Sequence, residues 1–404
     1  MSFVATEPTD LSEPLEPELV YDAILVPPEK KKTMVGRLAG FLYRWIRRGF
    51  CFAAVVGVLG VLTGIPLAQF IVLGYLLDVA GRLASGVKLQ DALPNFRLFG
   101  KLGLMCLGIF LATLPALLLV HLESVAQLVN PDSDQSMVLR VLAILSCVLS
   151  MAYLMWAWAR GGKIRHYLWP QPIRFAKEAW RPQTWNTMPD QLWDATVAFE
   201  IPKLFWLGLR GFLGTLVWLI PALIIIAVSR DVGGLGVAGL IGAIAIAALS
   251  VVMLYLPMLQ ANFAAENNLR ALFDVKRIRR EFKSAPWSWA LAMLLCLVVL
   301  STPLYLLKIE SIPEKVVWLP CLFFVAFGIP ARIGTGLALR RARRKEPMTG
   351  WWGKFSIYSS RLIIAATVFA YIVFLFVSSQ YISGAGLKAW VQQHAVLVPI
   401  PFLD

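Results

Sequence analysis

Four polar residues lie at the ends of long apolar runs, where their types and spacing could do chemistry. Asp78 and Arg82 are four residues apart, and so are Asn262 and Glu266. Residues at this spacing share one face of a helix, so the members of each pair can interact. Ionisable groups at membrane depth are costly and often serve a function. We predict that these four residues form one polar site. For Asp78 itself, an ion pair with Arg82 that only ends the apolar run is the more common arrangement, and a functional acid is the alternative.

Other residues that catalysis inside a membrane would need are missing from the apolar runs. Such chemistry usually requires Asp, Glu, His or Lys within the runs, and no acid lies in the middle of one. The histidines, His121, His166 and His394, lie at run ends or in loops. The chain has no phosphate-binding loop, no His-Glu-x-x-His motif and no nucleophile elbow. We predict a protein that is not an enzyme and has no cofactor. If it were an enzyme, Asp78 and Glu266 would be the candidate pair.

The cysteines give no sign of a metal or redox site. All five lie inside apolar stretches, and none is paired at a metal-ligand spacing. Buried cysteine behaves as a small apolar residue, so we predict no metal site.

The composition indicates a membrane protein. Of the 404 residues, 58% are hydrophobic and 15% are charged, and the mean hydropathy is +0.69. Soluble domains are about 45–50% apolar and about 25% charged. These values exclude a soluble enzyme, a disordered chain, a coiled coil and a disulfide-rich secreted domain. They predict an all-α, polytopic integral membrane helical bundle.

The apolar runs predict a helical hairpin followed by seven transmembrane helices. Residues 49–77 carry no charge, but Gly64-Ile65-Pro66 lies in their middle, and proline removes a helical hydrogen bond. We predict a helical hairpin over residues 49–80, either re-entrant or crossing twice. Seven further runs have about the 20 residues that a spanning helix needs. They are 102–122, 141–159, 207–229, 235–259, 287–307, 316–339 and 362–382.

The distribution of basic residues predicts the topology. If residues 49–80 fold back, 32 of the 38 lysines and arginines lie on one side of the membrane, whereas a single crossing gives at most 25. The positive-inside rule therefore favours the hairpin. It places the N-terminus, residues 81–101 and the predicted polar site at the cytoplasmic face of an inner membrane, with the C-terminus outside. Arg332 lies near one end of its run and is expected to reach the headgroups.

Hydrophilic segments flank the runs. Residues 1–35 hold seven acids and five prolines, which predicts a disordered acidic tail ahead of a membrane domain over residues 36–404. Residues 36–50 and 265–283 each carry an apolar and a basic face. This pattern predicts two amphipathic helices on the cytoplasmic surface, in contact with anionic lipid.

The largest hydrophilic segment, residues 160–203, is predicted to be a cytoplasmic loop rich in tryptophan. Trp169, Trp180, Trp185 and Trp193 lie among basic residues. Such interleaving can bind single-stranded nucleic acid. Beside membrane spans it is more typical of an interfacial belt, so we predict no nucleic-acid partner.

A cluster of small residues marks one of the runs. Gly233, Gly234, Gly236, Gly239 and Gly242 make one helix unusually smooth. Small residues let membrane helices approach closely, so we predict internal packing here.

Two patterns resemble an uncharacterised family of prokaryotic multi-pass membrane proteins, a domain of unknown function. The first is Gly-Tyr-Leu-Leu at residues 74–77 after the proline-broken run, followed by Arg82, Gly86 and Leu93-Pro94. The second extends from Pro257 through Asn-Phe-Ala at 262–264 to Leu-Phe-Asp at 272–274. The resemblance implies membrane residence and architecture. It implies no activity and no functional residues.

For function we expect a non-catalytic membrane protein that serves assembly, envelope organisation or lipid interaction. Its partners would be the bilayer, above all anionic lipids, with a protein partner or a second copy left open. The alternative is a transporter or permease for a neutral or lipid-like substrate. Its cavity would be walled by helix breaks at Pro66, Pro115 and Pro221, with Gln69 and Thr113 as polar groups.

Overall fold

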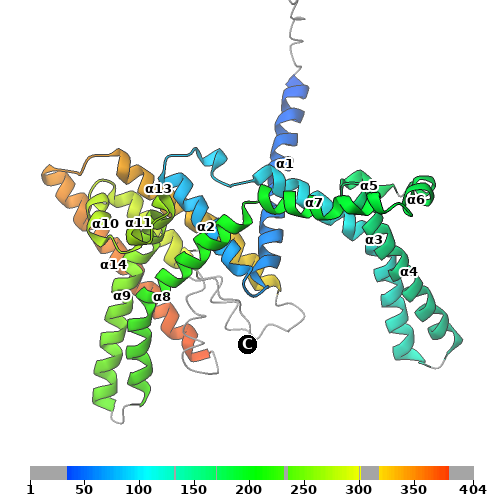
Figure 1. Ribbon diagram of the computed structural model, residues 1–404. Coiled ribbons are helices and arrows are strands. Elements are labelled where there is room, and N and C mark those ends of the chain that lie inside the picture. Colours follow the sequence, from blue (N-terminus) through cyan, green and yellow to red (C-terminus); the bar gives the residue numbers. More distant parts are fainter. Residues whose placement is uncertain are drawn as a thin grey trace, which may run out of the picture. The chain divides into compact units, whose positions relative to one another are not determined.

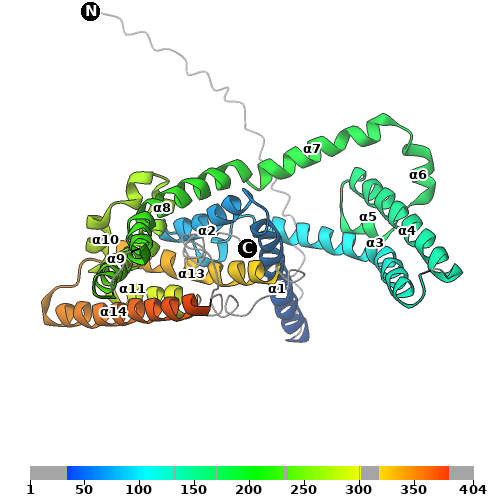
Figure 2. The same ribbon diagram turned by 90° about the horizontal axis from the view of Figure 1, so that it is seen from below.

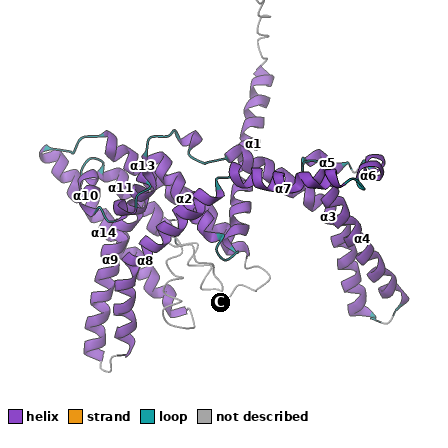
Figure 3. Cartoon of the chain, viewed as in Figure 1, coloured by secondary structure: helices purple, strands orange, loops and turns teal. Residues whose placement is uncertain are grey.

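The fold consists of helices. The computed structural model of the protein describes residues 34–131, 133–169, 171–231, 235–299, 301 and 318–381. Within these ranges every regular element is helical and none is a strand, which confirms the predicted fold class (Figure 3). The predicted disordered tail, residues 1–35, lies outside the described ranges except for its last two residues.

The chain consists of long helices with shorter helices and helical turns between some of them (Figure 1). In order they are α1 (Met34–Thr63), α2 (Gln69–Ala84), the 3-10 turn η1 (Leu89–Asp91), α3 (Phe96–Val129), α4 (Asp134–Ala159), α5 (Ile164–Leu168), α6 (Pro172–Glu178), α7 (Pro182–Ala198), α8 (Ile201–Asp231), α9 (Leu235–Glu266), the 3-10 turn η2 (Leu269–Leu272), α10 (Val275–Phe282), α11 (Pro286–Leu294), the π-helical turn η3 (Leu295–Val299), α13 (Trp318–Arg344) and α14 (Gly350–Tyr381).

Seven of the described helices are long and apolar enough to cross a membrane. They cover Gly40–Thr63, Phe96–Val129, Asp134–Ala159, Ile201–Ala222, Leu240–Glu266, Leu319–Arg344 and Gly350–Leu375. Six of them correspond to runs predicted after the hairpin. The chain is therefore a multi-pass membrane protein.

The predicted run 287–307 differs from the other six. Its described part is α11 with η3, which ends at Val299 and is bent by 111° against α10. Pro286 occupies the first turn of α11, where the backbone N–H groups make no hydrogen bond within the helix, so proline is tolerated there. Its ring prevents α10 from continuing. Most of the remainder of the run lies outside the described residues.

The break predicted in the first apolar run is present. α1 ends at Thr63 and α2 begins at Gln69, and between them Leu67 has a left-handed backbone with φ of 68°. Residues 36–50, predicted as a separate surface helix, are instead continuous with the first arm, because no proline interrupts the helical pattern there. α2 has 16 residues and is about 24 Å long, which is short of a hydrocarbon core of about 30 Å.

α2 is the central helix of the described bundle. It packs against α8, α9 and α13, and eleven of its sixteen residues are buried. Leu73 and Leu77 join one apolar cluster with α8, α9 and α14, whereas Tyr75 and Leu76 join a second with α1, α3 and α13. A helix that is apolar around most of its circumference is expected to be buried in this way.

Glycines allow α2 to touch its neighbours backbone to backbone. A Cβ atom added at Gly74 would lie 1.8 Å from the carbonyl oxygen of Leu204, and one added at Gly208 would lie 1.8 Å from that of Phe70. α2 and α8 therefore cross at a point where neither glycine can carry a side chain. By contrast, a Cβ atom at Gly242, in the predicted glycine stripe, would meet nothing within 4 Å, so the prediction of internal packing is wrong at this position.

Residues 160–203, expected as a loop, contain three helices, α5 to α7 (Figure 2). Pro172 and Pro182 stand in the first turns of α6 and α7, where proline favours helix initiation. Trp169, Trp180 and Trp193 are exposed. Trp185 is half-buried and donates its indole N–H to the carbonyl of Ala179 at 2.9 Å.

Replacing Gly208 by alanine should destabilise the fold strongly, because the new methyl group would overlap the Phe70 carbonyl and force α2 and α8 apart. We expect the free energy of unfolding to fall by about 2 kcal/mol or more, which is measured as a lower unfolding temperature in detergent. Gly242→Ala is the matched control and should be neutral or slightly stabilising, since alanine favours the helix. Equal stability of the two variants would contradict the central role of this crossing.

Candidate functional site

The predicted pair on α2 forms an ion pair. Arg82 donates from Nε to Oδ2 of Asp78 at 2.6 Å, and the Asp78 side chain is 13% exposed. The pair lies near the C-terminal end of α2, close to where Tyr75 donates its hydroxyl to the carbonyl of Pro94 at 3.2 Å. The carboxylate of Asp78 is thus neutralised by a residue of its own helix.

Asn262 connects α9 to two other elements. Its side chain is fully buried, and its amide nitrogen donates to the carbonyl of Ala271, within the short turn η2, at 2.9 Å. Its amide oxygen accepts from Nη2 of Arg343, near the end of α13, at 2.5 Å. Both functions of a buried amide are therefore satisfied, as stability requires.

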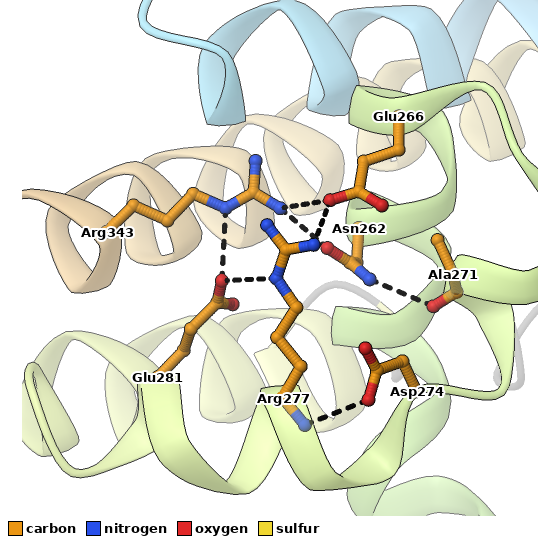
Figure 4. A network of polar contacts seen from close by, with 7 residues as sticks. All are labelled: Asn262, Glu266, Ala271, Asp274, Arg277, Glu281 and Arg343. Carbon is orange, nitrogen blue, oxygen red and sulfur yellow. Dashed lines mark hydrogen bonds and ion pairs between the residues drawn. The ribbon is translucent and has the colours of Figure 1, made fainter.

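Asn262 belongs to a charged network that Figure 4 shows from close by. Oε1 of Glu281 accepts from Nε of Arg277 at 3.1 Å and from Nε of Arg343 at 3.2 Å. Glu266 forms an ion pair with Arg277 and lies 3.7 Å from Nη2 of Arg343. We call these five residues, Asn262, Glu266, Arg277, Glu281 and Arg343, the rim cluster.

Local sequence explains how α10 reaches the rim cluster. Asp274 caps the helix by accepting the backbone N–H of Arg277 at 3.0 Å. Ile278 points inward and is 1% exposed, which fixes the rotation of the helix. Arg277 and Glu281, four residues apart, then face the ends of α9 and α13 (Figure 4).

The rim cluster balances two guanidinium groups against two carboxylates. Partial burial of Arg277 acts to lower its pKa, but its hydrogen bond to Glu281 and the charge of Glu266 outweigh this effect, so the pKa is raised. Arg277 therefore keeps its charge. Oε2 of Glu281 is buried without a hydrogen-bond partner.

The four predicted residues divide into two groups. Asp78 bonds to Arg82, and Arg343 contacts both Asn262 and Glu266. No hydrogen bond or ion pair between described residues joins the two groups. They lie on adjacent helices, because a Cβ atom at Gly81 of α2 would stand 2.6 Å from the backbone of Ala264 on α9.

Sequence reasoning missed three members of the rim cluster: Arg277, Glu281 and Arg343. The arginines lie in basic segments that were interpreted only as surface charge. A usable signal was the scarcity of acids: Glu266 and Glu281 are nearly the only carboxylates in a strongly basic stretch, and acids so placed attract arginine.

A second polar group lies inside the bundle. Arg332 is 3% exposed and donates from Nη1 to Oε1 of Gln260 at 2.6 Å, and Gln260 donates to the hydroxyl of Thr215 at 2.6 Å. The expectation that Arg332 reaches the headgroups is thus wrong. α13 continues to Arg344, so Arg332 lies near the middle of the helix and not near its end.

The described residues contain no group of three or more His, Cys, Asp or Glu side chains that could hold a metal ion. The five cysteines form no disulfide: Cys51, Cys296 and Cys321 are buried, while Cys106 and Cys147 are exposed.

Fold and site together define an all-helical, multi-pass membrane protein with a charged cluster at one end of its bundle. A family model described as "Protein of unknown function (DUF4013)" matches residues 193–309, so the chain contains such a domain. This match confirms the resemblance to a domain of unknown function. It includes the second of the two patterns, residues 257–274, and leaves the first, residues 74–94, outside. No curated protein and no solved structure was found to match the chain.

Replacing Glu281 by glutamine should loosen the rim cluster, because Arg277 and Arg343 would lose the carboxylate they share. Since the Glu281 side chain is 12% exposed, we expect the free energy of unfolding to fall by about 1–3 kcal/mol. The loss is measured as a lower unfolding temperature in detergent. Glu346→Gln removes an exposed acid of the loop before α14 and should have little effect. If both variants have the same unfolding temperature as the wild type, the cluster does not hold α10 in place.

Proposed function

We propose that the protein is a non-catalytic membrane protein that gathers anionic lipid at the cytoplasmic face of an inner membrane, in the service of membrane assembly or envelope organisation. The observation that carries this proposal is the exposure of basic side chains on α10. Lys276, Arg279 and Arg280 of this helix are exposed, whereas Arg277 is turned inward to the rim cluster. A short basic helix held rigidly at a bundle end offers fixed cations to anionic headgroups.

The proposal of a non-catalytic role is supported by how the acids are used. Asp78 and Glu266, the candidate pair for an enzyme, are each bound to arginine. One oxygen of each carboxylate is thus engaged by a guanidinium group, which a general base or nucleophile would first have to give up.

The proposed topology is supported by contacts among the segments expected in the cytoplasm. Asn95 donates to the carbonyl of Ala198 at 3.0 Å, and Arg340 donates to that of Val87 at 2.9 Å. Arg343 in turn reaches Glu281 of α10. Segments from four parts of the chain that share a positive charge are thus linked to one another, as a common side of the membrane would require.

Labelling of single cysteines in a cysteine-free variant would test the topology in intact cells. A cysteine at Lys88, in the segment between α2 and α3, should be protected from a reagent that cannot cross the membrane. A cysteine at Asn130, in the turn between α3 and α4, should react, because α3 is expected to carry the chain across. Labelling at position 88 from outside would overturn the proposed orientation.

The alternative of transport has lost part of its structural basis. Pro115 and Pro221 lie within the continuous helices α3 and α8, and Thr113 donates to backbone carbonyls of its own helix. Only Pro66 lies at a real break. The observation that still favours a transported lipid-like substrate is the buried pair of Arg332 and Gln260, since charges inside membranes often mark a substrate path.

Lipid analysis of native discs would test the proposed lipid association. The protein is extracted with its surrounding bilayer, and the ratio of anionic to zwitterionic lipid is compared with that of the whole membrane. Each exposed cation near the surface contributes about 1 kcal/mol of attraction, so Lys276→Gln with Arg280→Gln should reduce the enrichment severalfold.

The control for this experiment removes two charges elsewhere, Lys101→Gln with Arg140→Gln, and should leave most of the enrichment in place. No enrichment around the wild-type protein would refute the proposal. A stoichiometric protein partner in the discs would instead favour an assembly role. We expect no nucleic acid, since the exposed tryptophans of residues 160–203 suit an interfacial belt.

A further inference from the structure

A crevice with basic walls lies beside α10. It is enclosed by α9, α10, α11 and α14 and has a volume of about 520 Å³. Three cations line it: Arg279 and Lys283 from α10 and its C-terminal end, and Arg361 from α14. No acidic side chain lines the crevice, and among the described residues none forms an ion pair with these three cations. Their charge is available to a ligand.

Aromatic rings hold two of the cations without neutralising them. The guanidinium of Arg279 lies 5.3 Å from the ring centre of Tyr255, and its Nε donates to the Tyr255 hydroxyl at 2.9 Å. Arg361 lies 5.9 Å from the ring of Phe282 and 5.9 Å from that of Tyr358. Stacking of this kind orders arginine while leaving N–H donors for a phosphate.

The crevice continues into an apolar groove between α9 and α14. This groove also measures about 520 Å³ and shares Leu254 and Ala365 with the crevice. It extends to Ile246 on α9 and Val373 on α14, about 12 Å farther along each helix. Its one hydroxyl, that of Ser250, is donated to the carbonyl of Ile246 at 2.8 Å, so the wall offers no free polar group to a ligand.

The position of Arg361 places the junction of the crevice and the groove at the edge of the hydrocarbon layer. The helix is uncharged from Leu362 to its end at Tyr381, a length of about 30 Å, equal to the thickness of the hydrocarbon core. Trp351, Trp352 and Phe355, in the turns before Arg361, are exposed as in an aromatic belt. The cations therefore stand at headgroup level and the groove descends among the acyl chains.

We propose that the crevice and groove together bind one anionic glycerophospholipid of the surrounding bilayer. Its phosphate lies among Arg279, Lys283 and Arg361, and one acyl chain occupies the groove between α9 and α14. The uncompensated positive charge selects an anionic headgroup, and arginine binds phosphate through paired hydrogen bonds. A soluble anion would leave the apolar groove empty. This inference rests on the proposed lipid association and assigns to it one defined site.

The test measures binding of a single lipid by native mass spectrometry. Delipidated full-length protein in neutral detergent is titrated with phosphatidylglycerol and, separately, with phosphatidylcholine. We expect one phosphatidylglycerol molecule to bind about tenfold more tightly than phosphatidylcholine, because the three cations of the crevice repel the choline cation of phosphatidylcholine. Arg361→Gln should reduce this preference severalfold, because it removes one of the three cations. Arg280→Gln, which removes an equal charge from α10 outside the crevice, should keep it.

A second set of variants tests the groove without changing charge. Ala365→Trp fills the junction of crevice and groove, and Val373→Trp fills the far end of the groove. Both should lower the affinity for the first phosphatidylglycerol about tenfold, because the acyl chain can no longer fill the groove, while the unfolding temperature of the empty protein stays near that of the wild type. If one of the two variants fails to fold, the other alone tests the groove.

Three results would overturn the proposed site. The first is an equal loss of affinity in Arg361→Gln and Arg280→Gln, which would leave only the general attraction of α10 for anionic lipid. The second is equal affinity for the two lipids in the wild type. The third is a dimer abolished by Ala365→Trp, which would show a second copy in the groove. In each case enrichment in native discs separately decides whether the broader lipid association survives.

Discussion

The crossing of α2 with α8 is the constraint on which the rest of the bundle depends. At Gly74 and Gly208 the two backbones approach so closely that neither residue could carry a methyl group. In a membrane there is little hydrophobic force between helices, so close packing of this kind is a main source of cohesion. Gly81 against Ala264 and Gly336 against Ala80 extend the same principle to α9 and α13. The short central helix thereby fixes the positions of three longer helices.

The rim cluster follows from this packing. Because α9 and α13 are both held against α2, their ends bring Glu266 and Arg343 within reach of α10. Arg277 and Glu281 then close the network, and the amide of Asn262 ties it to the turn that leads into α10. The cluster uses its acids to hold a helix in place, which leaves the outward cations of that helix free for the proposed contact with lipid. Packing and charge balance are thus successive consequences of one arrangement, and the proposed lipid contact depends on both.

Composition and periodicity predicted the helical class, the break near Pro66 and six of the seven later spans, because apolar runs are a local property of sequence. The two halves of the predicted site, Asp78 with Arg82 and Asn262 with Glu266, also lie at i and i+4 in one helix. Arg277, Glu281 and Arg343 were missed because their partners come from elements that only tertiary packing brings together. Arg332 was misplaced for a related reason: hydropathy ended its run early, while the helix continues to Arg344.

The helix pair α3 and α4 behaves differently from the central bundle. Only 11% of the most apolar part of α3 and 6% of that of α4 is buried within the protein, so most of their surface is open to lipid or to another chain. α3 has 34 residues and is about 51 Å long, some 20 Å longer than the hydrocarbon core. The excess lies outside the apolar run of residues 102–122, which is about 32 Å long and matches the core, so the polar ends of α3 project beyond it. The orientation of this pair therefore depends less on the rest of the protein than does that of the glycine-packed helices around α2.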